Sequence, residues 1–457
     1  MPVKTELLQV PFSYLFRYND PMSVKTFPLS GEQLEKLAEQ YPTPFYLYDE
    51  GAIRQNAKRV LRAFSVFPGY KEHFAVKALP NPYILKILAE EGLGADCSSL
   101  PELLLADMAG MKGEELMFSS NETPAKEYIK ARELGAVINL DDFTHINFLE
   151  KTLKEFAGNS CFQSLPELIS CRYNPGPLKE GNAIIGKPEE AKYGFTRDQL
   201  FEGYKLLKAK GVKRFGLHIM VASNELSLDY HLETGKLLFE LALEIKAKCG
   251  VDLEYINLGG GLGIPYRPEQ EAVSWEELAG GLKKLYDEII LKGGLGGMAI
   301  HTEYGRPITG PYGWLVARAI HKKEIYRSYI GLDASMADLM RPALYGAYHH
   351  ITIPGKEKAP PVKTYDVVGS LCENNDKFAI QRKLPEIAVA AEGGAGDFVV
   401  IHDAGAHSRS MGFNYNGKLR CGELLLRPDG SIKQIRRAET PEDYFATLDL
   451  NAIEKFR

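Results

Sequence analysis

A lysine at the end of an apolar run is the first residue of this chain whose position suggests chemistry. The run 73–78 (HFAVKA) is typical of a buried strand, and a turn and a helix follow it. Lysine is rarely buried without a partner, and the strands of a β/α barrel end at the mouth that carries the catalytic groups. Lys77 is therefore a candidate nucleophile, although this segment on its own better fits a surface lysine whose alkyl chain covers apolar neighbours.

Two later strand ends carry residues that could bind charged groups. Gly259, Gly260 and Gly261 follow the run LEYINL, and backbone N–H groups around glycines can close on an anion, usually a phosphate. A tight turn from strand to helix would need the same glycines. Glu303 and Arg306 stand three residues apart after the next strand, so both can reach one site, or they form a surface ion pair.

Two turn-rich segments near the C-terminal end hold a further group of polar residues. In GSLCENNDKF, Cys372 stands beside Glu373, and a thiol in a polar loop can donate a proton. A lone cysteine is more often simply buried. The segment 403–417 contains His407 and Tyr415 and has no helix or strand pattern, which favours a site loop. No metal site is expected, because the sequence has neither an HExxH motif nor a calcium-loop spacing.

Length and composition restrict the class of protein. The chain has 457 residues, 45% hydrophobic and 25% charged, which predicts a globular protein of about two or three domains. A net charge of −5 predicts neither a nucleic-acid nor a membrane partner. No apolar run approaches the roughly 20 residues that span a bilayer, and the first residues (MPVKTELLQVPFSY) lack a signal-peptide pattern. The six cysteines form no CxxC pair, which is typical of a reducing compartment, so we expect a cytoplasmic protein.

Strand and helix patterns alternate over the first two thirds of the chain. Short apolar runs followed by helical spacing recur about eight times, starting with FYLYD at 45–49. Because such strands are buried on both faces, the alternation predicts an α/β fold, a (β/α)8 TIM-like barrel over residues 45–310. Strand and turn patterns dominate afterwards, so residues 311–457 are expected to form a mostly β C-terminal domain, which the lead-in 1–44 would complete.

Together these motifs resemble the fold-type III pyridoxal-phosphate decarboxylases, in particular the branch of diaminopimelate and D-ornithine/D-lysine decarboxylases. The resemblance covers nearly the whole chain in the family's order, and it implies the alanine racemase-like fold, a pyridoxal 5′-phosphate cofactor and a homodimer with shared active sites. The motifs that carry it are FAVKA (74–78), GADCSS (94–99), RYNPG (172–176), GLHIMVAS (216–223), GGGLG (259–263), EYGR (303–306), RPALYGAYHHI (341–351), CENND (372–376) and AGAHSRSMGFNYNG (404–417).

The resemblance implies a role for each matching residue. Lys77 would bind the cofactor covalently, and Glu303 would pair with its ring nitrogen. Cys372, contributed by the partner subunit, would protonate the carbon from which carbon dioxide departs. Burial at the barrel mouth would keep the Lys77 amine neutral, as a nucleophile requires. The other cofactor-binding positions would be Asp96, Arg172, Met220, Ser223, Gly260, Gly261, Gly305 and Tyr415. The substrate's far end would be held by Arg306, Arg341, Tyr345, Glu373 and His407.

The chain also departs from the family's pattern. Met220 stands where the family has a histidine that stacks on the cofactor, although a thioether can pack against a ring as well. EPGR becomes EYGR, CESGD becomes CENND, His407 replaces a tyrosine, and His350 replaces a common glutamate. Several of these changes concern the substrate's far end, so two substrates stay open. One is meso-diaminopimelate, giving L-lysine, and the other is D-lysine or D-ornithine, giving cadaverine or putrescine.

Two further functions fit parts of the pattern. An amino-acid racemase of the alanine racemase type shares the barrel and the lysine, but it lacks the cysteine loop that Cys372 occupies. A non-catalytic homologue would keep Lys77 and lose the substrate-end residues, which are retained here as Arg306, Arg341 and Tyr345. We therefore expect an amino-acid decarboxylase that acts at the D-configured carbon of a diamino acid.

Overall fold

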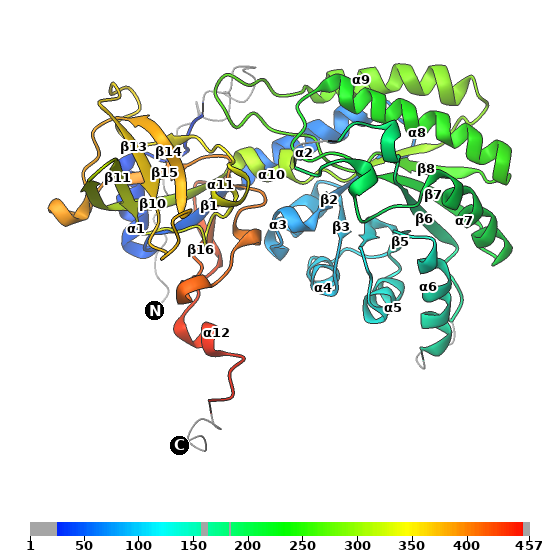
Figure 1. Ribbon diagram of the computed structural model, residues 1–457, viewed down its shortest axis with the longest axis horizontal. Helices are drawn as coiled ribbons and strands as arrows, with labels where there is room; N and C mark the ends of the chain where they lie inside the picture. The colour runs from blue at the N-terminus through cyan, green and yellow to red at the C-terminus, as the bar shows by residue number, and fades with distance from the viewer. Residues whose placement is uncertain (1–24, 157–162, 182–183, 451–457) are drawn as a thin grey trace. The chain divides into compact units, whose positions relative to one another are not determined.

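The computed structural model describes residues 25–156, 163–181 and 184–450. Within these residues the chain forms two compact units (Figure 1). The barrel unit holds residues 53–265 and 271–309, and the β unit holds residues 25–52, 266–270 and 310–450. No helix in the described part of the chain is both long and apolar enough to cross a membrane.

The barrel unit is built on a closed barrel of parallel strands, which confirms the predicted fold class. Every residue of β3, β4, β5 and β6 is buried, and for this reason their sequences lack a polar–apolar alternation. The strands are β2 (Lys71–Ala75), β3 (Gly94–Cys97), β4 (Leu116–Ser119), β5 (Val137–Leu140), β6 (Leu168–Tyr173), β7 (Arg214–Ile219), β8 (Leu253–Asn257) and β9 (Ala299–Thr302).

Helices surround the barrel on its outside (Figure 1). Their starts follow from local capping: Asn81 accepts a hydrogen bond from the Tyr83 N–H, and Thr196 and Ser274 cap two later helices in the same way. The helices are α2 (Glu50–Phe64), α3 (Pro82–Glu90), α4 (Leu100–Met108), α5 (Ala125–Leu134), α6 (Thr144–Glu155), α7 (Arg197–Ala209), α8 (Leu228–Cys249), α9 (Trp275–Tyr286) and the single turn α10 (Arg306–Thr309).

The β unit contains a nine-stranded sheet in the order β14-β13-β11-β10-β1-β16-β17, with β15 paired to both β10 and β12. Its short helices are α1 (Gly31–Gln40), α11 (Arg341–Tyr345) and α12 (Pro441–Phe445). The strands are β1 (Phe45–Asp49), β10 (Gly313–Glu324), β11 (Ser328–Leu332), β12 (Ile351–Thr352), β13 (Lys363–Val368), β14 (Lys377–Leu384), β15 (Phe398–Ile401), β16 (Gly422–Leu426) and β17 (Ile432–Arg436).

The strand Phe45–Asp49 corrects the sequence prediction. Its sequence pattern predicts the first strand of the barrel, but as β1 it pairs antiparallel with β10 and parallel with β16 in the β unit. Leu34 and Leu37 of α1 pack against Phe45, Leu47 and Trp314 in the core of this sheet. A strand buried on both sides and followed by a helix has the same sequence pattern in either unit, so periodicity could not distinguish them.

Candidate active site

A buried carboxylate, Glu303, lies at the mouth of the barrel just after β9, with only 6% of its surface exposed. His218 Nε2 lies 2.8 Å from one carboxylate oxygen, and Asn257 Nδ2 donates to the other at 2.7 Å. Ser119 Oγ lies 3.5 Å from that second oxygen and accepts a hydrogen bond from Asn139. These partners come from the ends of four different strands, so barrel closure itself assembles the carboxylate's surroundings.

The surroundings of Glu303 keep it ionised. Burial by itself would raise its pKa, but the interactions with His218 and the nearby Arg172 guanidinium outweigh burial and lower the pKa. Burial lowers the pKa of His218, so the imidazole is neutral near pH 7. Because a carboxylate can only accept, the neutral ring donates from Nε2. The barrel thus holds a buried negative charge, which suits a cationic ring N–H.

Asp96 and Arg172, also at the mouth, each have a buried polar atom that the described protein leaves without a hydrogen bond. These atoms are Asp96 Oδ1 and Arg172 Nε. Arg172 forms an ion pair with Asp141 at 3.1 Å. Burial and the charge of Glu303 raise the pKa of Asp96 well above its usual value. A ligand that carries polar ring substituents would satisfy these atoms, so the residues present fit a pyridoxal ring.

Lys77 follows β2 directly, in a short 3-10 turn formed by Val76–Ala78. The EYGR segment lies against this turn, because a Cβ on Gly305 would come within 2.8 Å of Ala78 Cβ. The charge of Lys77 acts to lower the pKa of Asp96, which places the lysine at the same mouth. Its side chain is exposed in the single chain, so the expected burial of Lys77 is not provided by this chain alone.

The turn Gly259–Gly261 is a cradle that only glycine permits. Gly259 and Gly261 have φ angles of +67° and +97°, which L side chains rarely adopt. A Cβ on Gly260 would lie 2.5 Å from the carbonyl oxygen of Glu303, and one on Gly261 would lie 2.6 Å from that of Ala222. This packing excludes side chains from the turn, and the N–H of Gly259 is bonded to Asn257 Oδ1, so the N–H groups of Gly260 and Gly261 are the candidates for binding an anion.

Three predicted residues lie beside this glycine turn. Met220 Sδ is 3.6 Å from the position that a Cβ of Gly259 would occupy. Arg306 Nη2 lies 3.5 Å from Ser223 Oγ, and the Arg306 side chain is 7% exposed. The barrel unit thus brings together most of the predicted cofactor residues, and with them Arg306 from the substrate group.

The remaining predicted residues belong to the β unit. The backbone N–H of Cys372 donates to Asn416 Oδ1 at 2.8 Å, so the cysteine loop lies next to Tyr415. Asp376 shapes that loop, because its carboxylate accepts from the N–H groups of Leu371 at 2.8 Å and Met336 at 2.7 Å. Cys372 and Tyr415 are both exposed, so they are available to a ligand or to a partner chain.

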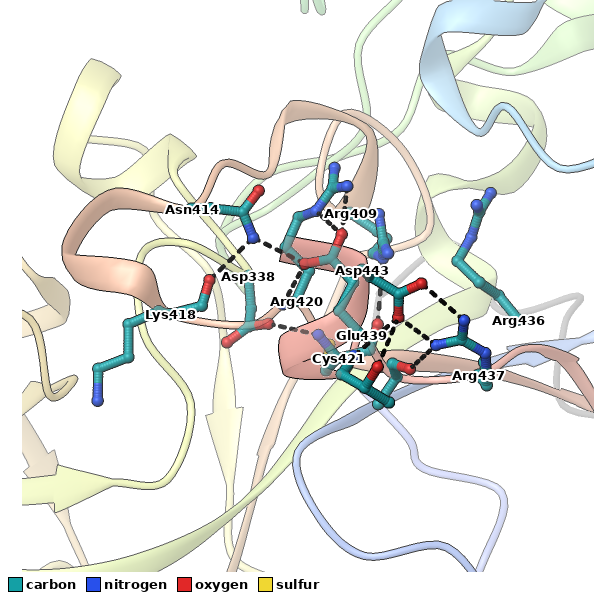
Figure 2. A network of polar contacts seen from close by, with 12 residues as sticks. Asp338, Arg409, Asn414, Lys418, Arg420, Cys421, Arg436, Arg437, Glu439 and Asp443 are labelled. Atoms are coloured by element: carbon teal, nitrogen blue, oxygen red, sulfur yellow. Dashed lines mark hydrogen bonds and ion pairs between the residues drawn. The ribbon is translucent and has the colours of Figure 1, made fainter. Parts of the chain in front are cut away.

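A polar network fixes the segment that carries Tyr415 (Figure 2). Asn414 Nδ2 donates to the Lys418 carbonyl at 2.9 Å and to Glu439 Oε2 at 2.7 Å. Arg420 donates to Glu439 through both its backbone N–H and its Nε. Burial would raise the pKa of Glu439, but these donors lower it to about 2. A turn-rich segment without regular structure is in this way held in one conformation.

The predicted substrate residues of the β unit differ in how they are held. Arg341 is 3% exposed, its Nη1 lies 2.9 Å from His349 Nε2, and its guanidinium stacks 4.6 Å from the Tyr266 ring centre. Tyr345 is 49% exposed at the end of α11. The last two residues are Glu373, whose carboxylate accepts from the Asn375 N–H, and His407, which has a φ of +52°.

Sequence reasoning missed the residues that surround Glu303. His218 lies inside the quoted motif GLHIMVAS and Asn257 inside the run LEYINL before the three glycines, but neither residue had a role assigned. Ser119 and Asn139 end or nearly end apolar strands, and a polar side chain at such a position faces the mouth of a barrel. That signal was present in the sequence for all four residues.

Comparison with known proteins places this chain among the pyridoxal-dependent decarboxylases. A family model described as "Pyridoxal-dependent decarboxylase, pyridoxal binding domain" matches residues 50–310. The chain is 40% identical over 432 residues to protein TabA of Pseudomonas amygdali pv. tabaci, covering 94% of this chain and 96% of that protein. It is 34% identical over 418 residues to a diaminopimelate decarboxylase of Methanothermobacter thermautotrophicus, covering 91% and 94%. The structure of M. jannaschii diaminopimelate decarboxylase with L-lysine superposes with a TM-score of 0.82 at 26% identity, covering 94% and 97%.

Proposed function

We propose that this chain, which belongs to the family of pyridoxal-dependent decarboxylases, removes the carboxylate from the D-configured carbon of a diamino acid. The protein is a carboxy-lyase that uses pyridoxal 5′-phosphate and acts on a small amino acid. The observation that carries the proposal is the ionised carboxylate of Glu303, buried at the barrel mouth next to the turn that bears Lys77.

The barrel residues divide the work of holding the cofactor. Pyridoxal phosphate, when bound, supplies an electron sink for the electron pair that remains when carbon dioxide departs. Lys77 would hold the cofactor covalently through Nζ and release it to the substrate amine. Glu303 would keep a proton on the ring nitrogen, and the N–H groups of Gly260 and Gly261 would bind the phosphate. Met220 Sδ would pack against the ring.

We assign the final proton transfer to Cys372 Sγ of a partner subunit. The support is that Cys372 and Tyr415 are held next to each other on an exposed part of the β unit. Leu344 and Tyr345 of the same unit are 55% and 49% exposed in the single chain, so both are open to contact with a second copy. The proposed assembly is therefore a homodimer in which each active site uses residues of both chains.

For the substrate we favour meso-diaminopimelate, which carries a second carboxylate at its far end. Arg306 is retained and buried in the barrel unit, and its guanidinium suits bidentate recognition of a carboxylate. Relatives named diaminopimelate decarboxylase at about a third identity support the same choice. D-Lysine or D-ornithine is the second candidate. It is favoured by the changed loop residues Asn374 and His407, and by a 40% identical relative with a different name.

The experiment that separates the two candidates measures carbon dioxide release from meso-diaminopimelate, D-lysine and D-ornithine by the wild type and by Arg306→Gln. If the far carboxylate binds Arg306, the variant should lose roughly 10- to 100-fold in kcat/KM for meso-diaminopimelate, as expected of a hydrogen bond between charged groups. Its activity on D-lysine should change little. A wild type that releases carbon dioxide from D-lysine and not from meso-diaminopimelate would reverse the choice.

A further inference from the structure

One side chain joins the two ends of the proposed cofactor site. Asn257 is the last residue of β8, and it is completely buried. Its Nδ2 donates to Glu303 Oε1 at 2.7 Å, and its Oδ1 accepts from the N–H of Gly259 at 2.9 Å. The amide therefore contacts the ring-nitrogen carboxylate with its donor and the glycine turn with its acceptor.

The backbone reinforces this connection. The N–H of Glu303 donates to the carbonyl of Gly259 at 2.8 Å, and the N–H of Leu258 donates to the carbonyl of His301 at 2.9 Å. Because a Cβ on Gly260 would lie only 2.5 Å from the Glu303 carbonyl, the turn and the end of β9 are in direct contact. Glu303 and the glycine turn cannot shift independently without breaking hydrogen bonds that lie out of water.

We propose that Asn257 is a positioning residue that couples phosphate binding at Gly259–Gly261 to the orientation of the Glu303 carboxylate. A phosphate that orders the turn fixes the Gly259 N–H, which fixes the Asn257 amide and with it the oxygen of Glu303. Such coupling is reciprocal, so a correctly paired ring nitrogen also strengthens the binding of the phosphate. The inference rests on the proposed roles of Glu303 and the glycine turn, and it adds a residue that neither role includes.

The test is a thermodynamic cycle on cofactor binding. The dissociation constants of pyridoxal 5′-phosphate and of pyridoxal, which lacks the phosphate, are measured by calorimetry for the apoprotein and for Glu303→Gln. With Asn257 present, the effects of removing the phosphate and of changing Glu303 should be non-additive by about fivefold or more. In an Asn257→Leu background, the effects of removing the phosphate and of Glu303→Gln on the dissociation constant should be additive to within about twofold.

Two variants keep the test independent of folding. Asn257→Ala removes both the donor to Glu303 and the acceptor for Gly259 without adding bulk, so it should also abolish the non-additivity. Asn56→Leu is the matched control, because Asn56 is another buried amide of the barrel unit that bridges two elements, through the carbonyls of Pro307 and Ile308. This control should leave the non-additivity as in the wild type.

The outcomes distinguish two kinds of failure. Additive effects with Asn257 present, or non-additivity that persists in both Asn257 variants, would overturn the coupling and leave the assignment of Glu303 intact. If Glu303→Gln changes neither dissociation constant, the role of Glu303 fails as well, and the coupling fails with it.

Discussion

His218 Nε2 donates to Glu303 Oε2 across 2.8 Å, and the two side chains are only 1% and 5% exposed. The pair combines a neutral imidazole with an ionised carboxylate, since burial lowers the pKa of the histidine and its hydrogen bond helps to lower that of the glutamate. The hydrogen bond from His218 thus helps to stabilise the buried negative charge of Glu303, which the ring nitrogen of the cofactor would need as a partner.

Removing the His218 donor should therefore reduce catalysis. For His218→Leu we expect kcat to fall roughly 10- to 100-fold, the loss of one hydrogen bond to a buried charge. The pKa of Glu303 should rise, so the acid limb of the kcat profile and of the cofactor's absorbance titration should move to higher pH. His218→Gln retains a donor and should recover part of both effects, whereas His145→Leu on α6 should change neither. An unshifted acid limb in His218→Leu would show that His218 does not act through Glu303.

Lys77 should be the residue that binds the cofactor covalently. The purified protein should show the visible absorption band of a protein-bound pyridoxal, and Lys77→Ala should lack it. Lys86→Ala is a suitable control, because Lys86 is an exposed lysine on the helix that follows. Persistence of the band in Lys77→Ala would require another lysine to hold the cofactor.

Shared active sites predict complementation between inactive variants. Lys77→Ala and Cys372→Ala disable the site through different residues, so a mixed dimer would have one site with both residues intact. Co-refolding equal amounts should restore roughly a quarter of the wild-type activity, because half of the dimers are then mixed and each has one working site. Each variant refolded alone gives the baseline. Tag-purified mixed dimers without activity above that baseline would place Cys372 outside a shared site.

The network around Glu439 should make stability depend on pH in the acid range. The pKa of Glu439 in the folded protein is about 2, below the value of about 4.3 expected in the unfolded chain. A carboxyl group whose pKa is lower in the folded protein stabilises the fold at every pH above its unfolded-state pKa. This contribution to the free energy of unfolding is lost as the pH falls from about 5 to about 2. Glu439→Gln should flatten that part of the curve of urea midpoint against pH, whereas Glu32→Gln on exposed α1 should not. Parallel curves for the wild type and Glu439→Gln would contradict the role of Glu439.

Much of the barrel could be predicted because its strands and turns depend on the residues of a short stretch of sequence. Strands buried on both faces need short apolar runs, and the glycines of 259–261 are dictated by backbone contacts that exclude a Cβ. The β unit was harder, because β14 and β17 carry exposed charged residues and lack a continuous apolar run. β1 was misplaced because a doubly buried strand looks the same in either unit. The exposure of Lys77 could not be predicted, since it depends on how neighbouring segments cover the mouth.

The residues that form hydrogen bonds to Glu303 could not be assigned a role from the sequence, for a different reason. Lys77, Glu303 and the glycine turn were found through residue types that chemistry uses directly. His218 and Asn257 act through another side chain, so their role depends on distances that spacing along the chain does not give. Such positioning residues become visible only when the strand ends are seen side by side.

The most direct test of the central claim is the stereochemical origin of the carbon dioxide. The holoenzyme is given meso-diaminopimelate labelled with carbon-13 in either the D-side or the L-side carboxylate, and in parallel D- and L-lysine labelled at C1. We predict labelled carbon dioxide only from D-configured centres, and none from Lys77→Ala. Release from an L-configured centre, or racemisation of these amino acids without release of carbon dioxide, would contradict the proposed function.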